Sequence, residues 1–214
     1  DWSSDVCSSD LAAFDTAYRQ LADEYRCEYV FKTAVIHHAL HAEPTANPFV
    51  GLPVVSSIAD VVIAGQTAAA FEIKTDLDSF SRLELQLFSY SRCFDKVFVV
   101  VSTTKADRAL DDVPDHVGVL MCDHDAGVMQ ARPASGGHAQ LDITSIFRVL
   151  RQDERLAVLH RQTGYTADVP SARLYSRTAE LFAQLPIETA YTEFVTELRG
   201  RDMRQRRSEE HTSE

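Results

Sequence analysis

The sequence predicts an α/β (α+β) domain followed by an all-helical C-terminal region. Three observations support this class. A helical segment precedes three short segments rich in β-branched and apolar residues, and a second amphipathic helix follows them. A strongly apolar strand, KVFVVVS, comes next. Beyond residue 135 the pattern is helical throughout. The resulting order α-β-β-β-α-β indicates one domain with a helical appendage.

Each predicted element has a local reason. Residues 13–41 have apolar side chains at helical intervals, with a break near Arg26, and two prolines in EPTANP (43–48) end this helix. Residues 79–94 repeat apolar side chains with the same spacing. KVFVVVS (96–102) is too apolar for an edge strand and predicts a buried central one. The other strands are expected at 50–57, 58–65, 68–75 and 117–122, and the tail helices at 143–163, 171–184 and 186–198.

Both ends of the chain are expected to lie outside the domain. A single DNA element can encode DWSSDVCSSD, and its last bases require leucine at position 11. With one permitted choice of codons, the reverse complement of that element encodes RSEEHTSE (207–214). One element in two orientations explains both ends, as a ligated sequencing adapter in a bacterial metagenomic fragment would. We therefore expect residues 1–11 and 207–214 to be adapter-derived, 12–135 to form the domain, and 136–206 to form the helical region.

Composition limits the classes of function. The formal charge is −11, and it becomes −6 when the terminal segments, with one arginine and six acids, are left out. This balance argues against coating nucleic acid by bulk charge, but it allows a local basic cleft or an acidic site neutralised by metal. The remaining cysteines, Cys27, Cys93 and Cys122, form no CxxC pair and predict reduced thiols in a cytoplasmic protein. No apolar run has the length of a membrane helix, so no membrane partner is expected.

Three charged residues interrupt segments that are otherwise apolar strands. Asp60 lies in IADVVI, and Glu72 and Lys74 lie in AFEIKT. Such charges are costly in a strand of this kind unless they are paired or bound to metal. Glu72 and Lys74 share one face of their strand because they are two residues apart. A hairpin with its turn centred on Gln66 would place Asp60 directly opposite Glu72.

This arrangement predicts a particular chemistry. Two carboxylates without histidine or cysteine favour Mg²⁺ (or Mn²⁺), which accepts phosphate oxygens as further ligands. The metal can activate water and neutralise charge on phosphorus, and a neighbouring lysine can orient or deprotonate the attacking water. The implied reaction is hydrolysis of a phosphodiester bond.

The same residues resemble the PD-(D/E)xK nuclease superfamily. Asp60 matches its aspartate on the second strand, and EIK (72–74) matches its (D/E)xK motif on the third. In QLFSY, Gln86 and Tyr90 match the QxxxY motif of the RecB-like branch. The segments CEYVFK, ADVVI, FEIKTDLDSFSRLELQLFSY and FDKVFVVV resemble a family of uncharacterised bacterial proteins within this superfamily. The resemblance covers about residues 26–122.

The resemblance implies a restriction-endonuclease-like αβββαβ core with a mixed sheet. It also implies catalytic roles for Asp60, Glu72, Lys74 and Gln86, in which Asp60 and Glu72 hold Mg²⁺ or Mn²⁺ and Lys74 activates water. Glu28, Tyr90 and Arg82 are the supporting residues that it suggests. One departure is Ala59, which stands where the superfamily often has proline.

A structural alternative accompanies each of these roles. Glu72 and Lys74 would then form a surface ion pair on an exposed strand face, Tyr90 would belong to the core, and Arg82 would be a solvated charge. Asp78 is expected to cap the following helix rather than bind metal. The arginines at the end of the last helix suit the helix dipole better than a DNA backbone; they are Arg199, Arg201, Arg204 and Arg206.

The sequence thus predicts a Mg²⁺-dependent nuclease, with DNA as the expected nucleic-acid partner. The alternative is a catalytically silent nuclease-like module that binds nucleic acid or a protein partner. A homodimer is compatible with either function.

Overall fold

The computed structural model describes Thr16 and residues 28–123 and 127–202. The adapter-derived segments expected at 1–11 and 207–214 lie outside the described residues, as do Cys27, Arg204 and Arg206. In chain order the elements are α2 (Glu28–Ala42), β1 (Asn47–Val54), β2 (Ser57–Ala64), β3 (Ala68–Lys74), α3 (Leu83–Ser91), β4 (Lys96–Ser102), α4 (Ala106–Asp112), β5 (Gly118–Asp123), β6 (Gly127–Arg132), α5 (Ile143–Val149), α6 (Gln152–Thr163), α7 (Ser171–Phe182) and α8 (Ile187–Gly200). The predicted order α-β-β-β-α-β is present from α2 to β4.

The strands form one mixed sheet in the order β1-β2-β3-β4-β5-β6. Pairing is antiparallel from β1 to β3, parallel from β3 to β5, and antiparallel again between β5 and β6. The α+β class is therefore confirmed. β4 is an inner strand, as its apolar sequence predicts, and Val99, Val100 and Val101 are fully buried.

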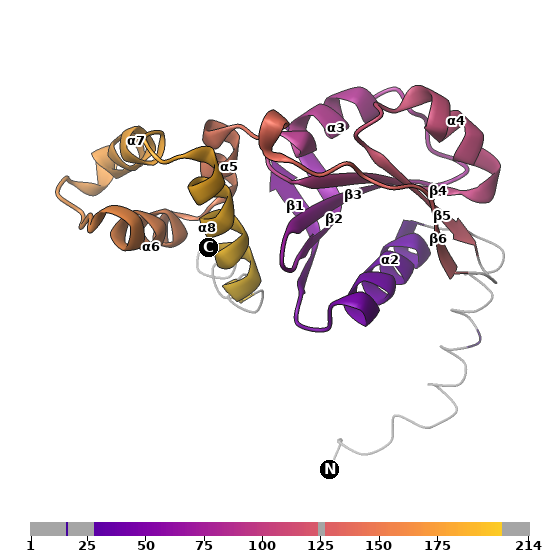
Figure 1. Cartoon of the computed structure of the whole chain (residues 1–214), viewed down its shortest axis with the longest axis horizontal. Coiled ribbons are helices and arrows are strands. Elements are labelled where there is room, and N and C mark those ends of the chain that lie inside the picture. The colour runs from indigo at the N-terminus through magenta and orange to yellow at the C-terminus, as the bar shows by residue number, and fades with distance from the viewer. Residues whose placement is uncertain (1–15, 17–27, 124–126, 203–214) are drawn as a thin grey trace, which may run out of the picture.

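The two faces of the sheet have separate cores. α2 covers one face, where Phe31 and Val35 pack against strand residues such as Phe71 and Ile73. α3 and α4 cover the opposite face (Figure 1), and Leu87 of α3 belongs to the core on that side. Residues 28–91 thus place one helix on each side of the β2–β3 hairpin.

The hairpin has the register that the sequence predicts. Val61 pairs with Phe71 and Ala64 pairs with Ala68, so the turn is centred on Gln66. The paired ladder ends at Val61 and Phe71, one position before Asp60 and Glu72. The carboxylates therefore lie where the two strands stop pairing.

The C-terminal helices α5–α8 lie beside the sheet (Figure 1) and share the core of the α3 face. The rings of Phe94 and Phe194 lie 5.8 Å apart between centroids. The Ala68 backbone N–H donates to the Tyr191 hydroxyl oxygen at 3.1 Å, and Asn47 Nδ2 donates to the Leu198 carbonyl at 2.9 Å. Ala68 begins β3, so these contacts lie at the end of that strand opposite Lys74.

Several elements differ from the sequence prediction. The segment 143–163 forms two helices because Leu150 is extended and Glu154 caps a new helix by accepting the Arg151 backbone N–H at 2.7 Å. α4 and β6 were not predicted. β6 pairs with the edge of β5, and its Arg132 donates to the backbone carbonyls of Leu110 and Val117. Within 28–123 and 127–202, no helix is both long and apolar enough to cross a bilayer.

Candidate functional site

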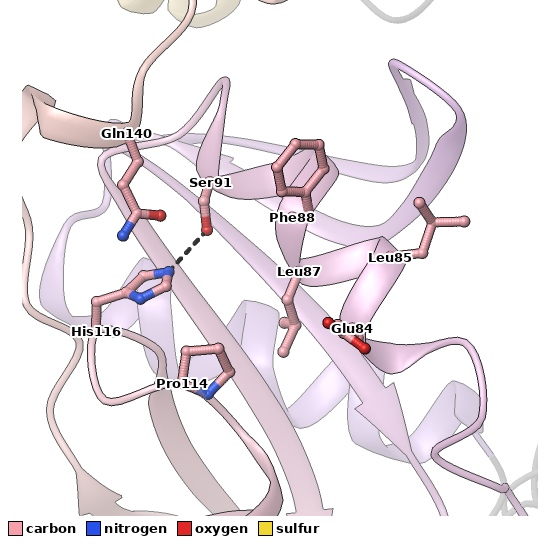
Figure 2. Close-up of a pocket in the computed structure, with 8 residues that line it drawn as sticks. All are labelled: Glu84, Leu85, Leu87, Phe88, Ser91, Pro114, His116 and Gln140. Carbon is pink, nitrogen blue, oxygen red and sulfur yellow. Dashed lines mark hydrogen bonds between the residues drawn. The ribbon is translucent and has the colours of Figure 1, made fainter.

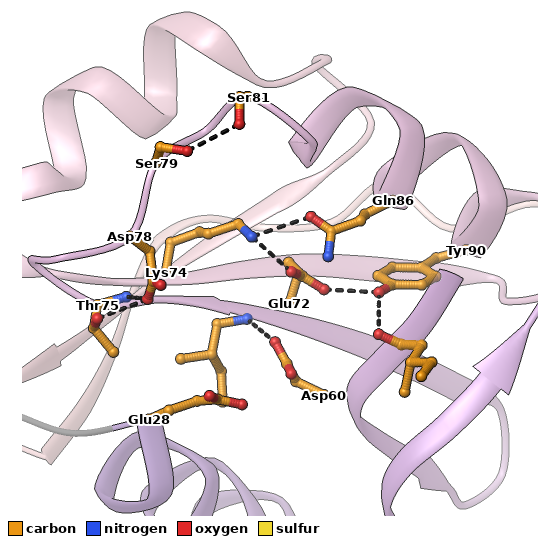
Figure 3. A network of polar contacts seen from close by, with 12 residues as sticks. Glu28, Asp60, Glu72, Lys74, Thr75, Asp78, Ser79, Ser81, Gln86 and Tyr90 are labelled. Atoms are coloured by element: carbon orange, nitrogen blue, oxygen red, sulfur yellow. Dashed lines mark hydrogen bonds and ion pairs between the residues drawn. The ribbon is translucent and has the colours of Figure 1, made fainter. Parts of the chain in front are cut away.

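Glu72 is a buried carboxylate at the carboxyl end of β3. It is only 2% exposed, and both of its oxygens accept hydrogen bonds. Oε1 accepts from Lys74 Nζ at 2.8 Å and Oε2 accepts from the Tyr90 hydroxyl at 2.7 Å (Figure 3). A carboxylate in this position would be strongly destabilising without such partners.

Lys74 lies on the same face of β3 as Glu72, as the two-residue spacing predicts. It is 9% exposed, and its ammonium also donates to Gln86 Oε1 at 3.1 Å. The alternative of an exposed surface ion pair is therefore wrong, because both charges are buried beneath α3. Two polar partners fix the direction of this amine.

α3 supplies Gln86 and Tyr90 from successive turns, and both side chains point toward β3 (Figure 3). Tyr90 is fully buried, and its hydroxyl oxygen also lies 2.7 Å from the Ile58 carbonyl oxygen. Burial, followed by the charge of Glu72, raises the pKa of Tyr90 far above its ordinary value. Tyr90 therefore remains a hydrogen-bond donor at every physiological pH.

Beyond the end of the β2–β3 ladder, the side chain of Asp60, in place of a backbone carbonyl, accepts a hydrogen bond from β3. Its Oδ2 accepts the Ile73 backbone N–H at 2.8 Å. Ala59 packs in the core under α3, whereas Val61 packs in the core under α2. Residues two apart normally share a face of a strand, so the alternation of faces along β2 is interrupted at Asp60. The expected direct pairing of Asp60 with Glu72 is thus not formed, because Asp60 turns toward the backbone of β3.

The two carboxylates nevertheless interact. The pKa of Asp60 is raised to about 6, first by burial and then by the negative charge of Glu72. The Ile73 N–H and the charge of Lys32 act in the opposite direction. Asp60 and Glu72 are therefore close enough to repel each other, and a cation between them would relieve that repulsion.

Lys32 of α2 is a site residue that sequence reasoning missed. Its Nζ lies 3.4 Å from Asp60 Oδ1 and also forms an ion pair with Glu28. The Lys32 side chain is 18% exposed and that of Glu28 is 52% exposed. The four-residue spacing of Glu28 and Lys32 on a helix was the available signal.

Glu28 is linked to Asp60 by Lys32, whose ammonium forms an ion pair with each of the two carboxylates. Among the residues that the structure describes, no group of three or more His, Cys, Asp or Glu side chains is placed to hold a metal. The candidate ligand set therefore consists of Asp60 and Glu72, without Glu28 as a third carboxylate.

Arg82 lies at the start of α3 and is exposed. The hydrogen bonds that join Glu72, Lys74, Gln86 and Tyr90 do not include it. The structure therefore brings Gln86 and Tyr90 of this helix to the site, but not the suggested supporting residue Arg82.

The loop from β3 to α3 has its own polar contacts. Asp78 accepts from the backbone N–H and the hydroxyl of Thr75, at 2.8 and 2.6 Å. The prediction that Asp78 caps α3 is wrong, because this loop closes on itself before the helix begins at Leu83. Lys105 donates to the carbonyls of Thr75 and Asp78, at 2.6 Å each, and fastens the loop to the chain after β4.

A separate cavity of about 470 Å³ borders the outer side of α3 (Figure 2). Leu85, Phe88 and His116 contribute to its lining, and His116 Nε2 lies 3.0 Å from Ser91 Oγ. Burial and then the charge of Arg132 lower the pKa of His116. Asp60, Glu72 and Lys74 are not among the lining residues, so this cavity is distinct from the carboxylate site.

Of the comparisons with known proteins, the scan against protein-family models identifies a family. A family model described as bacteriophage P4 protein cII matches residues 21–205. A search of curated proteins gave no match. A solved structure of a protein of unknown function from Silicibacter pomeroyi aligns with a TM-score of 0.39 and 16% identity, over 61% of this chain and 89% of that chain. A TM-score this low does not establish a shared fold. Because the family model spans most of the sequence, the chain belongs to the bacteriophage P4 protein cII family.

Proposed function

We propose that this protein is a metal-dependent nuclease that hydrolyses phosphodiester bonds, with DNA as its substrate. The observation that carries the proposal is the environment of Glu72. This carboxylate is buried at the carboxyl end of β3 and shared between Lys74 and Tyr90, and it interacts with the charge of Asp60. Burial of such a cluster gives little net stability, whereas carboxylates that hold a metal ion and an amine beside the attacking water are suited to phosphodiester hydrolysis.

The residues fit Mg²⁺ or Mn²⁺. Asp60 and Glu72 offer hard oxygen ligands, and their mutual repulsion favours a bound cation. The Ile73 N–H points to Asp60, and the N–H and C=O of one residue in a strand point to the same side. The Ile73 carbonyl would therefore be a further oxygen ligand on the side of Asp60. When bound, the ion would activate water and neutralise charge on phosphorus.

Lys74 is the proposed partner of the attacking water. Its amine is held between Glu72 and Gln86, so it is oriented before substrate binds. Positioned proton transfer of this kind typically contributes about 10²–10⁴-fold to a rate. Tyr90 acts through Glu72, because it fixes the second carboxylate oxygen.

The fold is compatible with this proposal. The α-β-β-β-α-β order and the mixed sheet agree with what the resemblance to restriction-endonuclease-like nucleases implies, and they support the proposal to that extent. The site lies at the carboxyl end of β3, which runs parallel to β4, and ligand sites of α/β sheets commonly occur at such ends. Asp60, Glu72, Lys74, Gln86 and Tyr90 all fall within the span of the family match.

The test is a cleavage assay with plasmid, linear and single-stranded DNA in the presence of Mg²⁺ or EDTA. We expect cleavage by the wild type with Mg²⁺ only, and its loss in Lys74→Ala and Asp60→Asn. Lys96→Ala is the matched control, because Lys96 is exposed at the start of β4 and distant from the site. Cleavage that persists in EDTA and in Lys74→Ala would reject the proposal.

A second candidate is a catalytically silent module that binds nucleic acid or a protein partner. The observation in its favour is that each carboxylate already faces a lysine, at 2.8 Å for Glu72 and 3.4 Å for Asp60. These pairs balance the two carboxylate charges without metal. This candidate predicts no Mn²⁺ binding, and binding to DNA or a partner that survives Lys74→Ala unchanged.

A further inference from the structure

Lys32 lies between two carboxylates on the α2 side of the site. We propose that its ammonium is a fixed cation of this site, which occupies the position beside Asp60 that a second divalent ion would need. On this view the site binds a single metal ion. The inference rests on the proposed function, because it concerns the charge balance and the number of ions at that metal site.

The two oxygens of Asp60 are engaged differently. Oδ2 accepts the Ile73 N–H at 2.8 Å, on the β3 side, where Glu72 lies one residue away. Oδ1 faces Lys32 Nζ at 3.4 Å. A second ion would need Oδ1 together with a further carboxylate. Among the residues that the structure describes, Glu28 is the carboxylate beside Lys32 on that side, and it is paired with the same ammonium.

The charges of the site also favour one ion. Glu28, Asp60 and Glu72 contribute three negative charges, and Lys32 and Lys74 contribute two positive charges. One divalent ion and one phosphodiester anion bring this formal sum to zero. A second divalent ion would leave two uncompensated positive charges in a partly buried site, which is unfavourable.

The position of Lys32 is set by the fold. It follows Phe31 on α2, and Phe31 and Val35 are buried in the core beneath this helix, at 3% and 1% exposed. The helix backbone therefore cannot move away from Asp60 without opening that core. Lys32 is a positioning residue in this proposal, because it acts on Asp60 and does not need to touch substrate.

The test is a Mn²⁺ titration of the metal-free protein, followed by calorimetry and by the electron paramagnetic resonance signal of free Mn²⁺. We expect one ion per chain for the wild type and two for Lys32→Met, which frees Asp60 and Glu28. Lys32→Arg keeps the charge and should bind one ion. The double variant Lys32→Met/Glu28→Gln lacks the second ligand and should also return to one. Lys96→Met, at an exposed lysine of β4, is the control and should bind one.

The outcomes separate this inference from the proposed function. Two ions in the wild type, or one ion in both the wild type and Lys32→Met, would overturn the role of Lys32 and leave the metal site standing. No Mn²⁺ binding by the wild type would reject the proposed function and this inference with it. Circular dichroism checks that each variant is folded, and Lys32→Gln replaces Lys32→Met if the latter is not. The number of Mn²⁺ ions bound by the wild type tests the inference even if every variant fails to fold.

Discussion

The hydroxyl oxygen of Tyr90 lies 2.7 Å from Glu72 Oε2 and 2.7 Å from the carbonyl oxygen of Ile58. One phenolic group thus joins α3 to the carboxylate of β3 and to the backbone of β2. A hydroxyl has only one proton to donate, so these two acceptors compete for it.

Tyr90→Phe removes this donor and leaves one oxygen of Glu72 without its partner. We expect the free energy of unfolding to fall by about 1–3 kcal/mol, the typical cost of an unsatisfied buried polar group. Urea unfolding followed by circular dichroism measures it. Tyr175→Phe is the control, since the Tyr175 side chain is exposed. If both variants lose less than about 0.5 kcal/mol, the hydrogen bond does not stabilise the site.

Gln86→Leu removes one of the two partners of the Lys74 ammonium. In the proposed nuclease, we expect the cleavage rate to fall about 10–100-fold, as for other residues that orient a catalytic group through a hydrogen bond. The free energy of unfolding should change little, because Gln86 is only half-buried. Cleavage kinetics with excess Mg²⁺ test this, and Glu84→Ala, on an exposed position of the same helix, is the control. An unchanged rate would show that Glu72 alone orients the amine.

Asp60 gives stability a specific pH dependence. Its folded pKa of about 6 lies above the ordinary value of 3.8, so ionisation is disfavoured in the folded state. The resulting loss of stability is absent below pH 3.8 and complete above pH 6. In metal-free protein, Asp60→Asn should therefore gain on the order of 3 kcal/mol over the wild type at pH 8, and little at pH 4. Urea unfolding at both pH values measures the difference.

The same reasoning predicts how metal changes stability. Mg²⁺ requires ionised Asp60, so we expect it to stabilise the wild type at pH 8 and to lose this effect as the pH falls through 6. Asp60→Asn should show no stabilisation by Mg²⁺ at either pH. A gain from Mg²⁺ at pH 4 equal to that at pH 8 would contradict a site that contains Asp60.

Arg201, the residue directly after α8, and Glu154, near the start of α6, form a buried ion pair. They are 8% and 6% exposed, and the guanidinium donates to both carboxylate oxygens, at 2.6 and 2.5 Å. Arg201→Met should cost about 3–5 kcal/mol because it leaves a buried carboxylate unpaired, and Glu154→Met/Arg201→Met should recover much of this loss. Thermal unfolding measures both. The pair of Arg161 and Glu193, in which the Arg161 side chain is 42% exposed, is the control, with an expected cost of about 1 kcal/mol or less.

The helical region contributes directly to the core under α3. Phe94 packs against Phe194, and the Tyr191 hydroxyl contacts the start of β3. A chain that ends at residue 135 exposes this surface, so we expect it to be unfolded or aggregated. A dispersed NMR spectrum and a cooperative thermal transition from residues 12–135 would show instead that the domain folds alone.

Much of the sheet could be predicted from the sequence because its signals are local. The apolar run of β4, the prolines after α2 and the spacing around Gln66 each fix an element through its own residues. β6 and the break at Leu150 depend on other causes. β6 exists because an edge of β5 is available for pairing, and α6 begins where Glu154 caps it.

The chain by itself determined which groups could form the site. Glu72 and Lys74 share a face because side chains alternate along a strand, and Gln86 and Tyr90 share a face because they lie one helical turn apart. Only the tertiary structure decided that Asp60 turns to the Ile73 backbone and faces Lys32. These contacts depend on where the β2–β3 ladder ends and on how α2 crosses the sheet. Such distances are set by packing between elements, which the periodicity of one segment does not encode.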